Sequence, residues 1–148
     1  MSDINKYIFA IGGGGFTHRK DKSLDNFILS IKNKEILKIG FLPTASKDNY
    51  EKTELFYERF KKTKHKLSHF ELLKKTIGFE EWVLSNDIIY VGGGNTYFML
   101  ELWKKNNLTN IFRRAYSNGI ILCGVSAGAV CWFENILSNS LNKKFIHL

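Results

Sequence analysis

Apolar residues in this chain fall into short continuous runs that alternate with segments of helical spacing. Runs of this length predict strands that are covered on both faces, as in a parallel sheet. They lie at 6–12, 35–42, 87–94 and 119–126, and a more alternating segment at 65–73 predicts one further strand. Helical spacing of apolar residues is found at 23–32, 49–64, 79–85, 96–105, 108–119 and 127–137. This alternation predicts an α/β fold: a doubly wound, mostly parallel sheet between helical layers, of flavodoxin-like type.

Two of the predicted helices carry more specific signals. Ser23 stands directly before an apolar-periodic segment, which predicts that it is the N-cap of the first helix. In the segment 49–64, Leu55, Phe56 and Phe60 fall on one face. We expect that face to pack against the sheet.

Four of the predicted strands end in unusual loops. In open α/β sheets, ligands bind outside the carboxyl ends of the strands, and parallel strands bring these ends to one edge. The loops are GGGGFTH, LPTAS, GGGNT and GVSAG, so we expect Gly14, Ala45, Gly94 and Ser126 to lie along one edge. Neither glycine loop is a dinucleotide fingerprint, because Thr17 and Tyr97 occupy the position of its third glycine.

The segment Gly124-Val125-Ser126-Ala127-Gly128 matches G-x-S-x-G between a predicted strand and a predicted helix. This is the context of a nucleophile elbow, a sharp turn that holds a serine hydroxyl above the sheet edge. The amide of Ala127 then lies at a helix N-terminus, where partial positive charge favours an oxyanion. The alternative is a small-residue turn in which Ser126 caps the following helix.

The motifs GVSAGA, YVGGGNT, FLPTAS and IGGGGF occur in this order over residues 7–137. Together they resemble the S51 serine peptidases, the dipeptidase E-like enzymes with cyanophycinase as a more distant relative. The resemblance implies a fold like that of class I glutamine amidotransferases, with serine in place of their nucleophilic cysteine. It also implies hydrolysis of small peptides through an acyl-enzyme, without a cofactor or a metal.

The resemblance implies roles for individual positions. Ser126 would be the nucleophile, and the amides of Ala127 and of Gly93 or Gly94 would form the oxyanion hole. Asn95, with Thr96, would shape the site or cap the following helix, and capping is the favoured role for Thr96. Glu134 is the sole acid after the serine; it would orient a histidine or bind a substrate amine, or make a polar contact at a helix end.

The sequence departs from the family pattern in the residues that would act as the base and the acid of a catalytic triad. The family's histidine follows the serine by a few tens of residues, whereas here His147 is the one downstream histidine. His18 falls in the first glycine loop, and His65 and His69 fall at or in the third predicted strand. The family's aspartate has no counterpart after Asp87, which starts its strand at the end away from the site.

Composition adds bounds on the class of protein. The length suits one domain, 1–148, and the resemblance implies that it lacks the family's C-terminal strands. The apolar runs are too short to span a bilayer, and the N-terminus has no cleavable signal pattern. Cys123 and Cys131 lie in apolar segments without metal-ligand spacing. We therefore expect a cytoplasmic protein with reduced thiols and no membrane partner.

The formal net charge of +8 is concentrated in the first half of the chain, most densely in RFKKTKHK at 59–66. Nucleic-acid binding is one interpretation of such a run. A solvated helix end is favoured, because the run lacks interleaved aromatics and no helix-turn-helix or zinc-finger pattern is found. We expect no nucleic-acid partner.

Two classes of function remain open from the sequence. The first is an S51-type serine peptidase that acts on small peptides through Ser126. The second is a non-catalytic member or fragment that acts at most as a small-ligand-binding domain. In either case we expect an uncovered apolar edge or face, and with it a homo-oligomer or poor solubility at neutral pH, because missing strands would leave the sheet unprotected.

Overall fold

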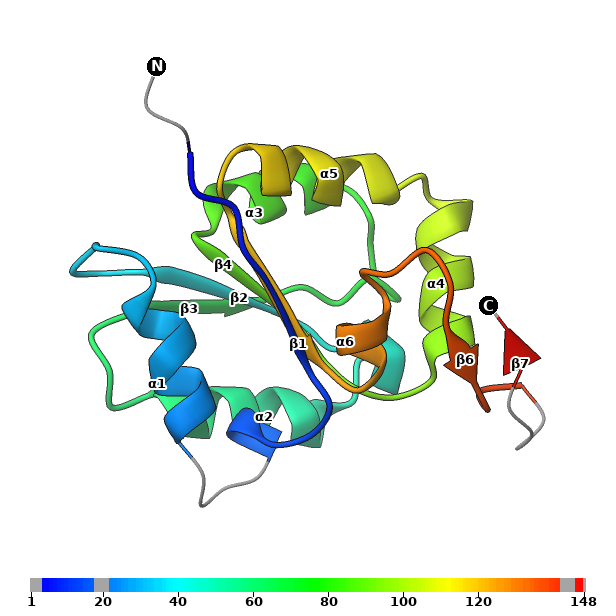
Figure 1. Ribbon diagram of the computed structural model, residues 1–148, viewed down its shortest axis with the longest axis horizontal. Helices are drawn as coiled ribbons and strands as arrows, with labels where there is room; N and C mark the ends of the chain where they lie inside the picture. Colours follow the sequence, from blue (N-terminus) through cyan, green and yellow to red (C-terminus); the bar gives the residue numbers. More distant parts are fainter. Residues whose placement is uncertain (1–3, 18–21, 142–145, 148) are drawn as a thin grey trace.

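A five-stranded, wholly parallel sheet forms the centre of the molecule (Figure 1). The computed structural model describes residues 4–17, 22–141 and 146–147. The strand order is β1-β5-β4-β2-β3. The strands are β1 (Ile8–Ile11), β2 (Lys38–Leu42), β3 (Lys66–His69), β4 (Ile88–Val91) and β5 (Ile121–Val125). The predicted parallel α/β fold is confirmed.

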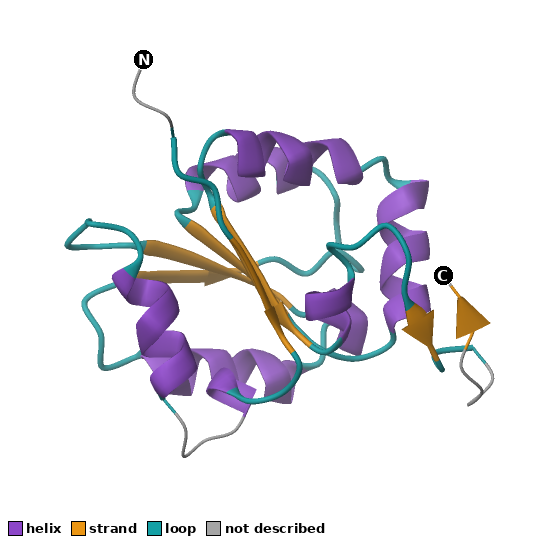
Figure 2. Cartoon of the chain, viewed as in Figure 1, coloured by secondary structure: helices purple, strands orange, loops and turns teal. Residues whose placement is uncertain are grey.

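Helices cover both faces of the sheet, as Figure 2 shows. On one face lie α1 (Ser23–Ser30) and α2 (Tyr50–Phe60), and on the other lie α3 (Phe79–Ser85), α4 (Thr96–Lys105), α5 (Thr109–Ser117) and α6 (Ala127–Val130). Two 3-10 turns, η1 (Gly15–Thr17) and η2 (Thr44–Ser46), follow β1 and β2. Two short strands, β6 (Leu137–Ser138) and β7 (Ile146–His147), form an antiparallel pair apart from the main sheet. None of the described helices has the length and apolar character needed to cross a bilayer.

Two apolar clusters hold the layers together, one on each face of the sheet. Phe56 and Phe60 of α2 are buried against β2 and β4, and the ring of Phe56 stacks on Phe41 at 5.1 Å between centroids. On the other face Trp103 of α4 packs against Phe112 of α5 at 4.5 Å. The central strands β4 and β5 are buried along their whole length, as expected for strands covered on both faces.

The predicted helix over 127–137 is wrong beyond its first turn. α6 ends at Val130, and the chain then turns toward β6. The apolar residues after Val130 do not form one buried helix face. Trp132 packs against Trp103 and Phe112, whereas Phe133 is 58% exposed. Glu134 therefore lies in the turn after α6 rather than near the end of a long helix.

The predicted cap of α1 is also wrong. The N-cap residue is Lys22, and Ser23 is the first helical residue. The strand predicted from residue 35 begins at Lys38, and the helix predicted to reach residue 64 ends at Phe60.

The basic segment at 59–66 makes several ion pairs with acids of neighbouring elements. Arg59 pairs with the buried Asp25 of α1 at 2.7 Å, and Lys61 pairs with Glu58 at 2.6 Å. Lys64 pairs with Glu35 at 2.9 Å. These ion pairs offset part of the positive charge at 59–66 locally.

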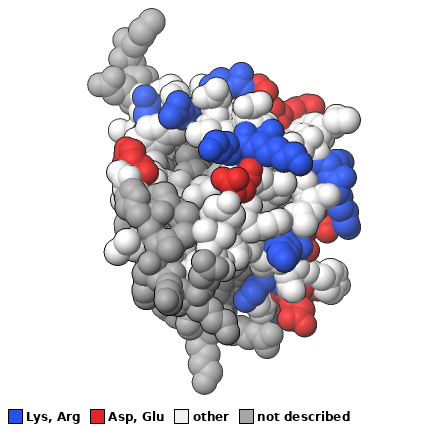
Figure 3. All heavy atoms as spheres, turned by 90° about the vertical axis from the view of Figure 1, so that its right-hand side faces the viewer, with Lys and Arg blue, Asp and Glu red and all other residues white. Residues whose placement is uncertain are grey.

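On the face that carries α4, basic and acidic side chains are interspersed among the described residues (Figure 3).

Candidate active site

Ser126 occupies the sharp turn between β5 and α6 in a backbone conformation that L-residues rarely adopt. Its φ and ψ are 55° and −115°, a region in which glycine is strongly preferred. Its amide donates to the carbonyl oxygen of Ile11 at 3.0 Å, and its own carbonyl accepts from Ala129 at 2.8 Å and from Val130 at 3.0 Å. The residue is exposed, and its side chain makes no capping hydrogen bond to α6. Ser126 is thus the N-cap residue of α6, as the alternative expected, but its hydroxyl does not cap the helix.

The two glycines of G-x-S-x-G are required by close backbone packing. A Cβ added at Gly124 would meet the carbonyl oxygen of Val91 at 2.7 Å and would also run into Gly128. A Cβ at Gly128 would lie against the carbonyls of Val91 and Gly92. The first turn of α6 thus rests directly on the end of β4, which fixes where Ser126 is presented.

The loop after β4 lies beside Ser126. A Cβ added at Gly93 would be 3.2 Å from the Cβ of Ser126 and 3.2 Å from the carbonyl oxygen of Val125. Gly94 has a φ of 151° and packs against the backbone of Ala45, whose carbonyl accepts from the Asn95 amide at 2.7 Å. The loops after β2, β4 and β5 therefore meet at one edge, and the loop after β1 leaves the sheet at the same end. The predicted gathering of Gly14, Ala45, Gly94 and Ser126 at that edge agrees with this arrangement.

Backbone amides are available next to Ser126. Ala127 is the first residue of α6, a position whose amide has no intrahelical acceptor. The amides of Gly93 and Gly94 donate to no backbone carbonyl of the described residues, whereas those of Gly92 and Asn95 are bonded to Leu42 and Ala45. Since Gly93 contacts Ser126 and Gly94 contacts Ala45, Gly93 is the nearer of the two to the serine.

The capping role expected for Thr96 belongs to Asn95. The side-chain oxygen of Asn95 accepts from the Phe98 amide at 2.8 Å, which caps α4. Thr96 is buried in the first turn.

Ser138 and Ser140 are part of the site's support and were not found from the sequence. The Asn95 amide side chain donates to the Ser140 carbonyl at 3.0 Å, and the Thr96 backbone amide donates to the Ser140 hydroxyl at 3.1 Å. The hydroxyls of Ser138 and Ser140 are 2.6 Å apart. The only signal in the sequence is the turn-prone string SNS, which does not indicate a contact with a residue 45 positions away.

Comparison with known proteins places this arrangement in a family. The family model described as "Peptidase family S51" matches residues 8–147. The chain belongs to peptidase family S51. It is 44% identical over 137 residues to the uncharacterised peptidase YgaJ of Bacillus subtilis, covering 91% of this chain and 60% of YgaJ. It is 35% identical over 103 residues to the uncharacterised peptidase Lin0382 of Listeria innocua, covering 66% of this chain and 48% of Lin0382.

Solved structures share the fold of this S51 chain. A peptidase from an acI-B1 Actinobacterium superposes with a TM-score of 0.67 at 18% identity, covering 90% of this chain and 59% of that one. A candidate peptidase E protein from Listeria monocytogenes gives the same TM-score at 20% identity, covering 87% and 61%. The chain thus spans at most about three fifths of the length of these relatives.

The described histidines of the S51 chain lie away from Ser126. His65 precedes β3, at the amino end of the sheet, and its Nδ1 accepts from the Leu37 amide at 3.2 Å. Burial, with Lys64 nearby, holds the pKa of His65 below its ordinary value. His69 ends β3 and bonds to the Tyr57 hydroxyl at 2.8 Å. Because β3 is three strands from β5, the two strands are about 14 Å apart across the sheet, and His69 is level with Cys123 rather than with Ser126.

The other two histidines were predicted as the ones able to approach Ser126. His18 lies outside the described residues. The backbone of His147 pairs with Leu137 in the β6–β7 ribbon, and its side chain lies outside what the structure describes. Nothing in the described structure tests whether either residue approaches Ser126, so the expectation of an incomplete triad stays a prediction.

The two candidate acidic residues, Asp87 and Glu134, lie in different parts of the structure. Asp87 precedes β4 at the amino end of the sheet, away from Ser126, as the sequence predicted. Its carboxylate accepts from the Lys34 ammonium at 2.8 Å and from the Lys38 backbone amide at 2.8 Å. These bonds hold the pKa of Asp87 below its ordinary value despite its burial. Glu134 is exposed in the turn after α6.

The thiols are free and their surroundings are apolar. Cys123 is buried in β5 and Cys131 is half-buried after α6. Burial raises the pKa of both thiols well above the ordinary value. They are therefore protonated at neutral pH and unsuited to act as nucleophiles.

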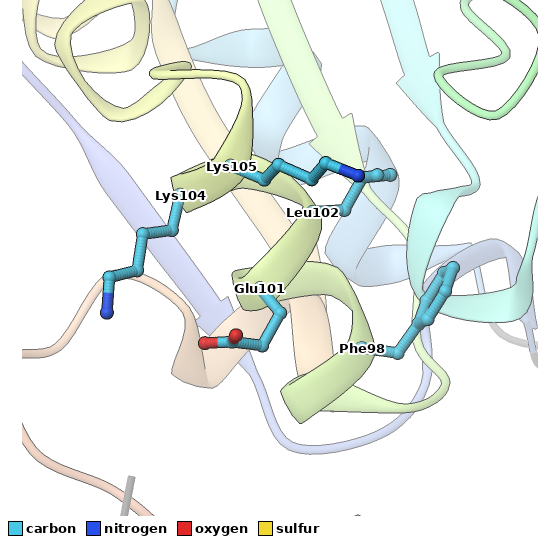
Figure 4. A pocket seen from close by; sticks show the side chains of 5 residues that line it. All are labelled: Phe98, Glu101, Leu102, Lys104 and Lys105. Carbon is cyan, nitrogen blue, oxygen red and sulfur yellow. The ribbon is translucent and has the colours of Figure 1, made fainter.

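A shallow depression of about 440 Å³ lies on the outer side of α4, as Figure 4 shows. It is lined by Phe98, Glu101, Leu102, Lys104 and Lys105. The Phe98 ring also faces the Lys47 ammonium, 5.5 Å from the ring centroid. These side chains cover the helix surface and do not include Ser126, which is itself exposed at the sheet edge.

Proposed function

We propose that the chain supplies the nucleophile and the oxyanion hole of a serine-type S51 peptidase that hydrolyses small peptides through an acyl-enzyme on Ser126. The observation that carries the proposal is the exposed Ser126 at φ 55° and ψ −115°, with Gly93 against its Cβ. Strain of this kind costs about 1–3 kcal/mol and persists where surrounding structure enforces it. Membership of a peptidase family supports the same conclusion.

The chemistry follows from this placement. The Ser126 oxygen attacks the scissile carbonyl carbon and loses its proton to a base, and the carbonyl π electrons move onto the oxygen. The amides of Ala127 and Gly93 stabilise that oxyanion, each contributing about 2.7–4 kcal/mol to lowering the barrier. Collapse of the intermediate expels the amine, which takes up a proton, and leaves the acyl group on Ser126. Water then attacks the acyl carbonyl carbon and loses its proton to the base. Ser126 leaves and takes up a proton, and the acid product is released.

A serine hydroxyl is a weak nucleophile until a base accepts its proton. Two of the four histidines in the chain, His65 and His69, are held elsewhere by Leu37 and Tyr57. This favours a formed elbow with an incomplete triad in the described part of the chain. The second candidate function, a small-ligand-binding domain built on the same edge, rests on that observation.

Fluorophosphonate labelling together with peptide hydrolysis tests the proposal. We expect Ser126-dependent labelling that Ser126→Ala abolishes and that Ser85→Ala, an exposed serine at the end of α3, leaves unchanged. With only the oxyanion hole in place, residual catalysis is expected at about 10³–10⁴ over water. Brisk turnover would overturn the incomplete triad and place the base among the chain's own histidines. An absence of labelling in the folded protein would overturn the catalytic proposal in favour of the binding domain.

Small peptides as substrates, which the family resemblance implies, and a cytoplasmic location, which the sequence analysis expects, belong to the same proposal. Hydrolysis of an N-terminally blocked dipeptide compared with the free dipeptide would show whether a free substrate amine is needed. Glu134, the sole acid after Ser126 in the sequence, is the acid to test for that amine, by Glu134→Gln. An unchanged KM for the free dipeptide in this variant would exclude that role.

A further inference from the structure

The backbone just after η2 is strained. Lys47 and Asp48 are consecutive residues with φ of 56° and 54°, in a left-handed region that L-residues other than Asn and Asp adopt infrequently. Strain of this kind persists only where the surrounding structure enforces it. Contacts from neighbouring elements must therefore hold the segment that leads from η2 into α2.

Asp48 joins this segment to the loop that follows β3. Its carboxylate oxygen Oδ2 accepts from the Leu73 backbone amide at 2.8 Å, although the two residues are 25 positions apart in the chain. The other oxygen, Oδ1, is buried and has no hydrogen-bond partner among the described residues. The Pro43 carbonyl accepts from the Ser46 amide at 3.0 Å and from the Asp48 amide at 3.2 Å, which ties Asp48 to the η2 turn. Asp48 thus bridges η2 and the loop after β3.

The η2 turn in turn supports the loop that carries Gly93. The Asn95 amide donates to the Ala45 carbonyl at 2.7 Å. A Cβ added at Gly94 would overlap the backbone of Ala45, so the two loops are in direct backbone contact at this point. A shift of η2 would therefore displace Gly94 and Asn95, and with them the adjacent amide of Gly93.

We propose that Asp48 is a positioning residue for the oxyanion hole: its bond to Leu73 holds η2 where Ala45 fixes the loop 93–95. This inference rests on the proposed function, in which the Gly93 amide binds the oxyanion. Such a donor acts at about 2.7–3.1 Å from the oxyanion, and a misplacement of about 1 Å costs on the order of 100-fold in rate. Asp48 acts through η2 and not on the reacting atoms.

Three variants at residue 48 separate the hydrogen bond from the backbone strain. Asp48→Asn keeps a side-chain oxygen that accepts from the Leu73 amide, and asparagine tolerates this φ. Asp48→Ala removes the acceptor, and Asp48→Gly removes both the acceptor and the steric cost of the conformation. We expect fluorophosphonate labelling of Ser126 to be slower by about tenfold or more in the alanine and glycine variants, and within about twofold of the unsubstituted protein in Asp48→Asn. Asp48→Gly should be at least as stable in urea as Asp48→Ala, so its slow labelling would not reflect unfolding.

Glu71→Gln is the matched control. Its carboxylate belongs to the same loop as Leu73 but pairs with Lys74 at 2.8 Å. We expect this variant to label at the rate of the unsubstituted protein, because removing a charge from the loop leaves the bond between Asp48 and Leu73 in place.

Hydrogen exchange follows the same connection without any catalytic step. In Asp48→Ala and Asp48→Gly we expect faster exchange at the Leu73 amide, which loses its acceptor, and at the Asn95 amide, whose acceptor Ala45 is no longer held. The Gly92 amide is the internal reference, because it donates to the Leu42 carbonyl at the end of β2. Its exchange should stay unchanged, which separates a shift of η2 from a general loss of stability.

The outcomes separate the role of Asp48 from the catalytic proposal. Normal labelling in Asp48→Gly, or labelling as slow in Asp48→Asn as in Asp48→Ala, would overturn the positioning role. Faster exchange at Leu73 with no change at Asn95 would overturn it as well, because η2 would then not transmit the loss. If the unsubstituted protein is not labelled at all, the proposed function fails, and exchange at Asn95 in the Asp48 variants still decides whether Asp48 holds the loop that carries Gly93.

Discussion

The amide of Ser126 donates to the carbonyl oxygen of Ile11 at 3.0 Å, so the strained turn is tied to the edge strand of the sheet. On its other side the Ser126 carbonyl accepts from Ala129 and Val130 in the first turn of α6. The Ser126 turn is therefore held on one side by β1 and on the other side by α6. This over-determination keeps an unfavourable backbone conformation populated.

Removing the side chain at Ser126 should stabilise the protein. Glycine adopts φ 55° and ψ −115° without the steric cost that a Cβ carries. We expect Ser126→Gly to be about 1 kcal/mol more stable than Ser126→Ala in urea unfolding, with both variants inert to fluorophosphonate. Equal stability of the two variants would show that the backbone at this position is not strained.

Gly128 should not tolerate a methyl group. Its Cβ would run into the Val91 backbone, which cannot move without displacing β4 from the sheet. We expect Gly128→Ala to lower the free energy of unfolding by about 1–3 kcal/mol, as overpacking does elsewhere. Gly12→Ala is the control, because no atom lies within 4 Å of its added Cβ. A loss of similar size in both variants would contradict the close approach of α6 to β4.

Ser140 should act on the site through the loop that carries Gly93. Its hydroxyl accepts from the Thr96 amide, and its carbonyl accepts from Asn95. We expect Ser140→Ala to cost about 1 kcal/mol of stability, to speed hydrogen exchange at Thr96 and to slow labelling of Ser126 several-fold.

Ser140→Thr keeps the hydroxyl oxygen and should restore both readouts. Ser30→Ala is the control, since the Ser30 hydroxyl donates locally to the Phe27 carbonyl on the other face of the sheet. A loss of stability without a change in labelling would limit Ser140 to a structural role. Unchanged hydrogen exchange at Thr96 would contradict the contact itself.

His65 should make stability depend on pH. The pKa of His65 in the folded protein is held below its ordinary value of 6.5, first by burial and then by Lys64. The unfolded chain therefore binds more protons in this range, and stability rises with pH. The contribution is complete above about pH 6.5 and is lost as pH falls through the lowered pKa. His65→Asn, which can still accept from Leu37, should flatten urea midpoints across this window, and an unchanged slope would exclude His65 as its source.

Much of the fold was predictable from the sequence, because it depends on local patterns. Interior parallel strands are short apolar runs, and this identified β1, β2, β4 and β5, while helical spacing identified α3 and α4 with their bounds. The elbow was also predictable, since only small residues fit at Gly124 and Gly128 and the motif lies between a strand and a helix. Pattern failed at α6, where the apolar residues after Val130 serve packing of Trp132 rather than a continuing helix.

The tertiary structure alone decided which residues meet at the sheet edge. Strand order follows from the packing of whole layers. No local pattern therefore predicted that β1 is an edge strand, or that the Ile11 carbonyl would accept from the Ser126 amide. The contact of Ser140 with Asn95 joins residues far apart in the chain, and only folding brings their hydrogen-bonding groups into range. The sequence by itself determined the type of each element and the presence of a serine turn, because these depend on near neighbours. The partners of that serine depend on long-range packing, which the order of residues along the chain does not reveal.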